Sequence, residues 1–240
     1  MKQPLDTPVM KLAAATAFVL VGASGCSLEQ FKHDPVYPKE AETCEQQAMI
    51  DDGEDRDDQI LVRQNRGGFI YTFVDTVGST ILPTESGFKM ERGGAHGSKY
   101  AVHITGKVAA TGETFAGVGM DLRNPRGGYN ASRYKGVSFL AKVGPKSTGH
   151  VRFSIPDVNT DKDGKVCTEC FNAFGIGVDL TEEWTRYEVA FSELKQEAGW
   201  GNPRPAALEI NKLFNVQWQV SAPGSVFDIW IDDVSFIGCP

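Results

Sequence analysis

Beyond its first residues, the sequence lacks any apolar run long enough to span a membrane, and no segment shows a sustained helical period. It also lacks a G-x-S-x-G elbow, an H-E-x-x-H pair and a P-loop, which excludes the enzyme classes that depend on those motifs. Basic residues are outnumbered, with 24 Lys and Arg against 31 Asp and Glu, and the net charge is −7. Because nucleic-acid binding needs clustered Lys and Arg, we expect no nucleic-acid partner.

The first 25 residues have the pattern of a signal peptide. Lys2 and Lys11 flank its start, and the apolar run over residues 12–21 is shorter than the roughly 18 residues of a spanning helix. Ala-Ser-Gly at residues 23–25 directly precedes Cys26, which resembles the lipobox of bacterial lipoproteins, although alanine stands where leucine is usual. This resemblance implies cleavage before Cys26 and lipidation of that cysteine. The alternative is an ordinary signal peptide followed by a free cysteine.

Residues 26–48 are predicted to be a tether between the lipid and the domain, because they are polar and contain two prolines. Several acyl chains would hold such a protein stably at a membrane. Ser27 does not resemble the aspartate that retains lipoproteins at the inner membrane, so the resemblance implies an outer-membrane lipoprotein of the cell envelope. The remaining residues, 49–240, are predicted to form one domain, which we expect to be monomeric.

The domain is predicted to be all-β. Its apolar segments are rich in Val, Ile, Phe, Tyr and Trp, and residues typical of turns separate them. Phe214, Val216, Trp218 and Val220, for example, share one face of a predicted strand. The predicted strands are 68–75, 99–108, 116–122, 136–143, 150–157, 186–194, 214–220 and 227–236. Many strands without interposed helices predict an antiparallel β-sandwich.

Several of these segments resemble, in order, the jelly-roll carbohydrate-binding domains of the galactose-binding-like superfamily, in the group around family 11 modules and the CIA30 domain. The segment IDDGEDRDDQ (50–59) resembles the acidic opening of that group, although Gly53 stands where Phe is usual. FDIWIDDVSF (227–236) resembles its closing strand, and GWG (199–201) with LFNVQWQV (213–220) resembles a segment between them. The resemblance covers about residues 49–238 and implies a jelly roll that binds carbohydrate.

The four cysteines other than Cys26 allow three disulfide pairings, and an exported protein is expected to form them. We favour Cys44–Cys239 and Cys167–Cys170, because the first and last strands are neighbours in a jelly roll. The alternative for the Cys-x-x-Cys pair is half of a zinc site, but no second Cys or His pair stands at a suitable spacing.

The resemblance also implies a structural Ca²⁺ between the first and last strands. Candidate ligands are Asp51, Asp52 and Glu54 near the beginning and Asp232 or Asp233 near the end. By strict alternation one aspartate of this pair points inward, and Asp233 shares its face with Ile231. The alternative is a solvated acidic edge. A second acidic segment, residues 157–164, matches only the first part of an EF-hand loop, so we expect a plain Asp/Asn/Gly turn there.

Sugar-binding sites combine aromatic platforms with planar hydrogen-bonding groups. The polar sides of the alternating strands therefore supply candidates for a groove, and two tyrosines in a Gly-rich loop are candidates for its rim. If Trp218 is in the core, the glutamines beside it line the groove. The candidate ligand-binding residues are Asp121, Arg123, Arg152, Ser154, Gln217, Gln219, Tyr129 and Tyr134. The alternative is that these polar residues only face water.

The sequence thus predicts a non-catalytic lipoprotein that binds polysaccharide and is held at a membrane by its lipid. A protein-interaction module of the CIA30-like kind is the first alternative, and a long apolar patch on the concave sheet would favour it. A glycan hydrolase or lyase is the second, and two carboxylates facing one another across a cleft would favour that.

Overall fold

A computed structural model describes residues 42–84 and 87–239. This part of the chain forms strands, one short α-helix and short 3₁₀ turns, η2 (Lys162–Gly164) and η3 (Phe191–Glu193) among them. The helix is α1 (Cys44–Ala48), and the strands are β1 (Met49–Asp51), β2 (Ile70–Val74), β3 (Thr80–Leu82), β4 (Glu91–Arg92), β5 (Tyr100–Lys107), β6 (Ala116–Asp121), β7 (Gly136–Val143), β8 (His150–Ile155), β9 (Phe174–Asp179), β10 (Thr185–Ala190), β11 (Asn215–Val220) and β12 (Val226–Ile237).

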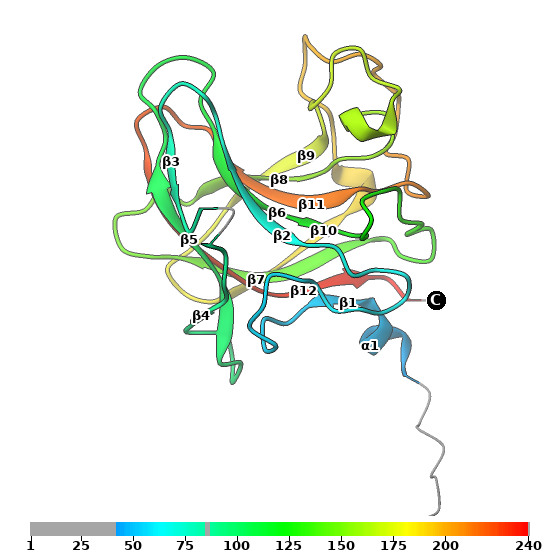
Figure 1. Cartoon of the computed structure of the whole chain (residues 1–240), viewed down its shortest axis with the longest axis horizontal. Coiled ribbons are helices and arrows are strands. Elements are labelled where there is room, and N and C mark those ends of the chain that lie inside the picture. The colour runs from blue at the N-terminus through cyan, green and yellow to red at the C-terminus, as the bar shows by residue number, and fades with distance from the viewer. Residues whose placement is uncertain (1–41, 85–86, 240) are drawn as a thin grey trace, which may run out of the picture. The chain divides into compact units, whose positions relative to one another are not determined.

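The strands form two antiparallel sheets that face each other (Figure 1). The seven-stranded sheet has the order β10-β7-β12-β5-β3, with β1 paired to β12 and β4 paired to β5. The five-stranded sheet has the order β2-β6-β11-β8-β9. The predicted antiparallel β-sandwich is confirmed.

The core lies between the sheets, because the apolar residues of each alternating strand share one face. Phe139 of β7 packs against Phe153 of β8 and Trp218 of β11, with ring centroids 5.2 Å apart in both pairs. Trp218 is only 1% exposed. Since Trp218 points inward, Gln217 and Gln219 on either side of it point outward from the five-stranded sheet.

All eight predicted strands are present, each within four residues of its predicted ends. The sequence did not predict the short strands β1, β3 and β4, nor β9 at the edge of the five-stranded sheet. The strand β9 alternates Phe174, Ile176 and Val178 with two glycines and an aspartate. The glycines weaken the strand signal, because glycine is depleted in strands.

The folded domain begins before residue 49, where the predicted tether ended. Thr43 caps α1 with its side chain, and Ala48 at the end of this helix is buried. A disulfide joins Cys44 to Cys239, and a second joins Cys167 to Cys170, so the favoured cysteine pairing is confirmed. The predicted signal peptide, Cys26 and most of the predicted tether lie outside the described residues.

Within the described ranges, every helix is too short or too polar to cross a membrane.

Replacing Cys44 and Cys239 together by alanine is expected to lower the free energy of unfolding by up to about 5 kcal/mol, because this bond closes a long loop. The two cysteines are 195 residues apart, whereas Cys167 and Cys170 are three apart. The double alanine variant of the second pair is therefore the control, and a much smaller loss is expected from it. Guanidinium unfolding measures both, and equal losses would contradict the explanation by loop length.

Candidate functional site

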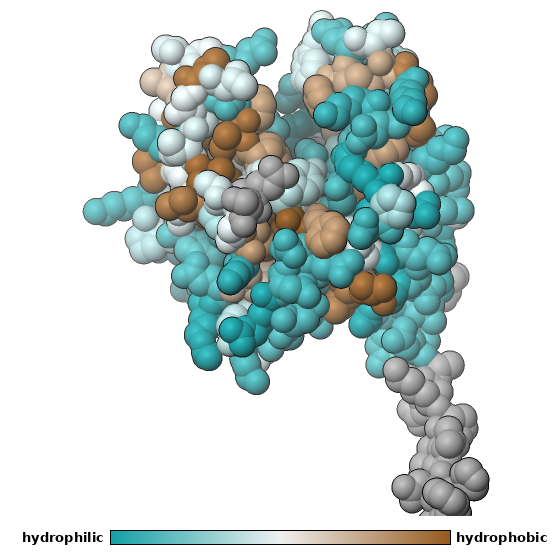
Figure 2. Space-filling view, viewed as in Figure 1, coloured by the Kyte–Doolittle hydropathy of each residue, from teal (hydrophilic) through white to brown (hydrophobic). Residues whose placement is uncertain are grey.

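The outer face of the five-stranded sheet is the candidate site, and we call it the groove face. Figure 2 shows a hollow between two lobes, which Figure 1 identifies as loops at the two ends of these strands. The first lobe contains residues 75–79, 109–115 and 221–225, and the second contains residues 156–173 and 195–206. The outward residues of the groove face are Phe69, Tyr71, Phe73, Gly117, Gly119, Asp121, His150, Arg152, Ser154, Gly175, Gly177, Asp179, Gln217 and Gln219.

Two aromatic rings of β2 lie across glycines of β6. A Cβ atom at Gly119 would lie 2.6 Å from the Tyr71 ring, and one at Gly117 would lie 2.6 Å from the Phe73 ring. Any larger residue at either position would therefore lift the ring away from the sheet. The two ring centroids are 6.1 Å apart and the ring planes are tilted by 44°, so the rings form an aromatic strip at one edge of the groove face.

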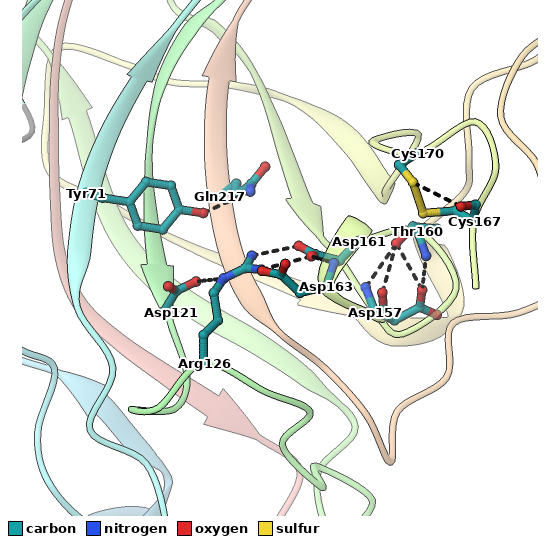
Figure 3. Close-up of polar contacts among 10 residues, drawn as sticks. All are labelled: Tyr71, Asp121, Arg126, Asp157, Thr160, Asp161, Asp163, Cys167, Cys170 and Gln217. Carbon is teal, nitrogen blue, oxygen red and sulfur yellow. Dashed lines mark hydrogen bonds and ion pairs between the residues drawn. A yellow bond between two sulfur atoms is a disulfide. The ribbon is translucent and has the colours of Figure 1, made fainter. Parts of the chain in front are cut away.

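The hydroxyl group of Tyr71 extends this strip toward the centre of the sheet. Gln217 of β11 donates a hydrogen bond from Nε2 to the Tyr71 hydroxyl oxygen over 3.1 Å, as Figure 3 shows. Burial raises the pKa of Tyr71, and the nearby Asp121 carboxylate raises it further. The phenol is therefore protonated at neutral pH and keeps its own O–H for donation.

The opposite edge of the groove face is covered by the Arg152 guanidinium. It lies over Gly175, where a Cβ atom would be 2.9 Å from its Cζ. Its Nη2 donates to the carbonyl oxygens of Ala173 and Lys195, over 3.1 and 3.0 Å. Burial lowers the pKa of Arg152, and the Glu197 carboxylate, 3.6 Å from Nε, opposes that shift. The guanidinium is thus fixed over β9, with N–H groups left to face a ligand.

The centre of the groove face carries hydrogen-bonding side chains. Gln219 lies between Gly117 and Arg152 on the neighbouring strands, and its amide has no hydrogen-bond partner among residues 42–84 and 87–239. Gln217 faces Ser154 across the β11–β8 pair, and Ser154 is almost fully buried. The centre therefore offers amide donors and acceptors at the level of the sheet.

Arg126 joins the end of the groove face to the second lobe (Figure 3). Its Nε donates to Asp121 at the end of β6 over 2.9 Å, and its two Nη atoms bind both oxygens of Asp161 over 2.8 and 2.6 Å. It also donates to Asp163. One guanidinium therefore holds three carboxylates and fixes loop 123–128 to the second lobe.

The acidic segment 157–164 is a hydrogen-bonded turn, as expected. One Asp157 oxygen accepts from the backbone N–H groups of Asn159 and Thr160, and its other oxygen accepts from the backbone N–H of Glu209. Asp157 is fully buried, and Asp161 and Asp163 bind Arg126. These side chains make the second lobe a rigid wall of the hollow.

Most of the predicted ligand-binding residues lie together on the groove face, but three do not. Arg123 follows the end of β6, is exposed, and donates to the carbonyl of Gly128 over 3.2 Å. The prediction that Tyr129 and Tyr134 rim the groove is wrong. Both are buried and stack on Phe236, with centroids 5.7 and 4.6 Å away. Their loop folds over the open end of the sandwich, so these tyrosines complete the core.

Sequence reasoning missed the aromatic strip. Phe69, Tyr71 and Phe73 alternate with inward residues along β2, so a period-two aromatic pattern was present in the sequence. Tyr71 is not among the predicted ligand-binding residues, because single aromatic residues in strands are most often buried. The signal that identifies these residues is their shared face, opposite the glycines of β6.

The carboxylates on or beside the groove face each contact a basic side chain. Asp121 binds Arg126, Asp179 lies 2.8 Å from His150 Nδ1, and Glu197 lies near Arg152. Burial raises the pKa of Asp121, and Arg126 opposes that shift. Glycoside hydrolysis by two carboxylates needs one acid and one base or nucleophile on either side of the scissile bond. The groove carboxylates are instead engaged in fixing side chains and loops.

The predicted Ca²⁺ ligands lie away from the groove face, between β1 and β12. Asp51 and Asp232 line one small cavity, and Asp51 Oδ2 is buried without a partner among the described residues. Burial raises the pKa of Asp51 to about 8 and that of Asp232 to about 6. Two carboxylates, one of them with an unpaired oxygen, offer the hard oxygen ligands that a cation such as Ca²⁺ prefers. In the described ranges, no cluster of three or more His, Cys, Asp or Glu side chains is placed to hold a metal.

The other predicted calcium ligands do not line this cavity. Glu54 accepts hydrogen bonds at Oε1 from Ser98 and from the backbone N–H groups of Lys99 and Tyr100. Asp52 accepts from the backbone N–H of Glu54. Alternation predicted that Asp233 lies on the same face as Ile231. It does not, because a bulge interrupts β12 between residues 232 and 235. Asp233 has a φ of 46°, and its neighbour is the buried carboxylate.

Comparison of the sequence with protein-family models and with curated proteins gives no match. The fold is a jelly-roll β-sandwich, and solved structures of carbohydrate-binding modules have the same fold. One is the family 11 module from Clostridium thermocellum in complex with a β-1,3-1,4-mixed-linked tetrasaccharide, with a TM-score of 0.55 and 15% identity, covering 80% of this chain and 95% of that one. Another is the family 11 module of a cellulosomal cellulase of Clostridium thermocellum, with a TM-score of 0.52 and 14% identity, covering 70% and 87%.

Proposed function

We propose that this protein binds polysaccharide on the groove face without cleaving it. The observation that carries the proposal is the arrangement of flat side chains over glycines at both edges of one sheet. Tyr71 and Phe73 offer aromatic surface at one edge, and Arg152 offers a planar donor at the other. Gln217 and Gln219 lie between them with amide groups.

This arrangement suits a sugar chain for physical reasons. A pyranose ring has an apolar face that stacks on an aromatic ring, and its equatorial hydroxyls need donors and acceptors in the plane of the ring. Four inter-strand spacings separate β2 from β9, which is roughly 19 Å. The hollow between the lobes therefore has room for several sugar units of a chain that crosses the strands. A module with this fold binds a mixed-linked tetrasaccharide, which supports the proposal.

Two observations favour this function over the alternatives. A protein-interaction module would need a continuous apolar patch, whereas the groove face, which is the floor of the hollow, carries Gln217, Gln219 and Arg152 beside its aromatic residues. A hydrolase would need free carboxylates, whereas Asp121, Asp179 and Glu197 each lie beside a basic side chain.

Replacing Tyr71 by alanine is expected to weaken polysaccharide binding roughly tenfold, because it removes the ring on which a sugar stacks. Affinity electrophoresis of the purified protein against cellulose derivatives, β-glucans, xylans and mannans measures the effect. The control is Trp184→Ala, which removes a half-buried aromatic residue beside β10 in the other sheet. Wild-type protein that binds none of these polymers would remove the proposed function.

We also propose a structural Ca²⁺ held by Asp51 and Asp232, with backbone oxygens and water completing its shell. Adding Ca²⁺ to chelator-treated protein is expected to raise its melting temperature, and Asp51→Asn is expected to abolish that rise. Mg²⁺ is the control, because it demands a tighter octahedral site. An identical melting temperature in EDTA and in Ca²⁺ would refute the site.

We further propose that Cys26 carries the lipid that holds the protein at the outer membrane. Cys26→Ala is expected to move the protein from the membrane fraction to the soluble fraction, because its acyl chains supply the membrane affinity. Cell fractionation with detection of the protein measures this. Unchanged fractionation of the variant would exclude the anchor and leave polysaccharide binding unaffected.

A further inference from the structure

Trp200 is presented from a turn of unusual backbone shape. Gly199 and Gly201, on either side of it, have φ values of 88° and 89°, in the left-handed region that favours glycine. A Cβ atom at Gly201 would lie 2.7 Å from the Cβ of Asn172, so glycine is required there. The Trp200 side chain is 37% exposed at the end of this turn.

The Asn172 side chain holds this turn in place. Its Oδ1 accepts from the backbone N–H of Glu197 over 2.9 Å. Its Nδ2 donates to the carbonyl oxygens of Glu197 and Trp200, over 3.0 and 2.7 Å. Asn172 is almost fully buried, so both ends of its amide serve this purpose. The turn is therefore rigid before any ligand arrives, which lowers the entropic cost of binding.

The turn is continuous with the groove face. Gly175 of β9 and Lys195 exchange two backbone hydrogen bonds, of 2.9 and 3.0 Å, so the Lys195 segment extends the sheet by one position. Arg152 reaches across β9 to the Lys195 carbonyl. One oxygen of Glu197 lies 3.6 Å from Arg152 Nε, and the other accepts from Trp200 Nε1 over 3.1 Å. A short chain of contacts thus links the floor to the indole.

We propose that Trp200 forms an outer subsite of the groove, where a sugar ring at the far end of a long oligosaccharide stacks. The inference rests on the proposed function and adds a second aromatic position at the edge opposite Tyr71. A half-exposed indole on a rigid turn suits stacking on an apolar sugar face. Its hydrogen bond to Glu197, which in turn lies beside Arg152, favours the glycan in the groove as its ligand, because the same sugar chain would reach it.

The distance of Trp200 from Tyr71 predicts that the contribution of Trp200 to binding depends on the length of the oligosaccharide. Five inter-strand spacings separate β2 from the Lys195 segment, which is roughly 24 Å. A short oligosaccharide stacked on Tyr71 does not span this distance, whereas a long one does. Trp200 should therefore affect the binding of long oligosaccharides only.

The test uses the purified full-length protein and a size ladder of oligosaccharides from mixed-linked β-1,3-1,4-glucan, beginning with the disaccharide. A second ladder comes from whichever polymer of the panel binds most tightly. Calorimetry compares the wild type with Trp200→Ala, Trp200→Phe and Tyr71→Ala, and Trp184→Ala is the matched control. Trp200→Phe keeps an aromatic ring while losing the hydrogen bond to Glu197, so it separates stacking from support of the turn.

We expect Trp200→Ala to weaken binding of the long oligosaccharides by roughly three- to tenfold and to leave the short ones unchanged. Trp200→Phe should restore most of the loss, and Tyr71→Ala should weaken binding at every length. Trp200→Ala that follows the wild type at all lengths, or that weakens all lengths equally, overturns the outer subsite while polysaccharide binding stands. Wild-type protein that binds no polymer of the panel overturns both proposals.

Discussion

The burial of Trp218 between Phe139 and Phe153 decides which side chains of the five-stranded sheet point into the core and which point outward. Because successive side chains of a strand point to opposite faces, this indole fixes the direction of Gln217 and Gln219, and a shift of one residue would reverse every side chain of β11. The packing is favourable enough to leave the indole N–H buried without a partner in the described part of the chain. The groove is thus a consequence of how the core is packed.

The floor and the walls of the hollow are fixed by different means. The floor belongs to strands, where glycines at 117, 119, 175 and 177 allow flat side chains to lie on the backbone. The wall at the second lobe belongs to loops, which carry little regular structure and are fixed by side chains. Arg126 binds Asp161 and Asp163 there, and Asp157 and Asn172 each hold several backbone groups. Binding surfaces placed on rigid elements need less ordering when a ligand arrives.

The sequence predicted those parts of the structure that strict alternation controls. The strands that carry Arg152, Ser154, Gln217 and Gln219 were predicted, and so was the face on which these residues lie. The predictions failed where local geometry or distant contacts decide. The strand β9 was missed because of the glycines that make the floor flat, and Asp233 was misplaced because a bulge interrupts β12. Tyr129 was misplaced because its loop pairs with Leu213, far along the chain. Such a contact is not visible in local sequence.

The bond between Cys44 and Cys239 brings the two ends of the folded domain together, with their Cα atoms 5.9 Å apart. A force that separates residues 44 and 239 would pass through this covalent link instead of through the sheets. The strands that carry the groove would bear none of that tension.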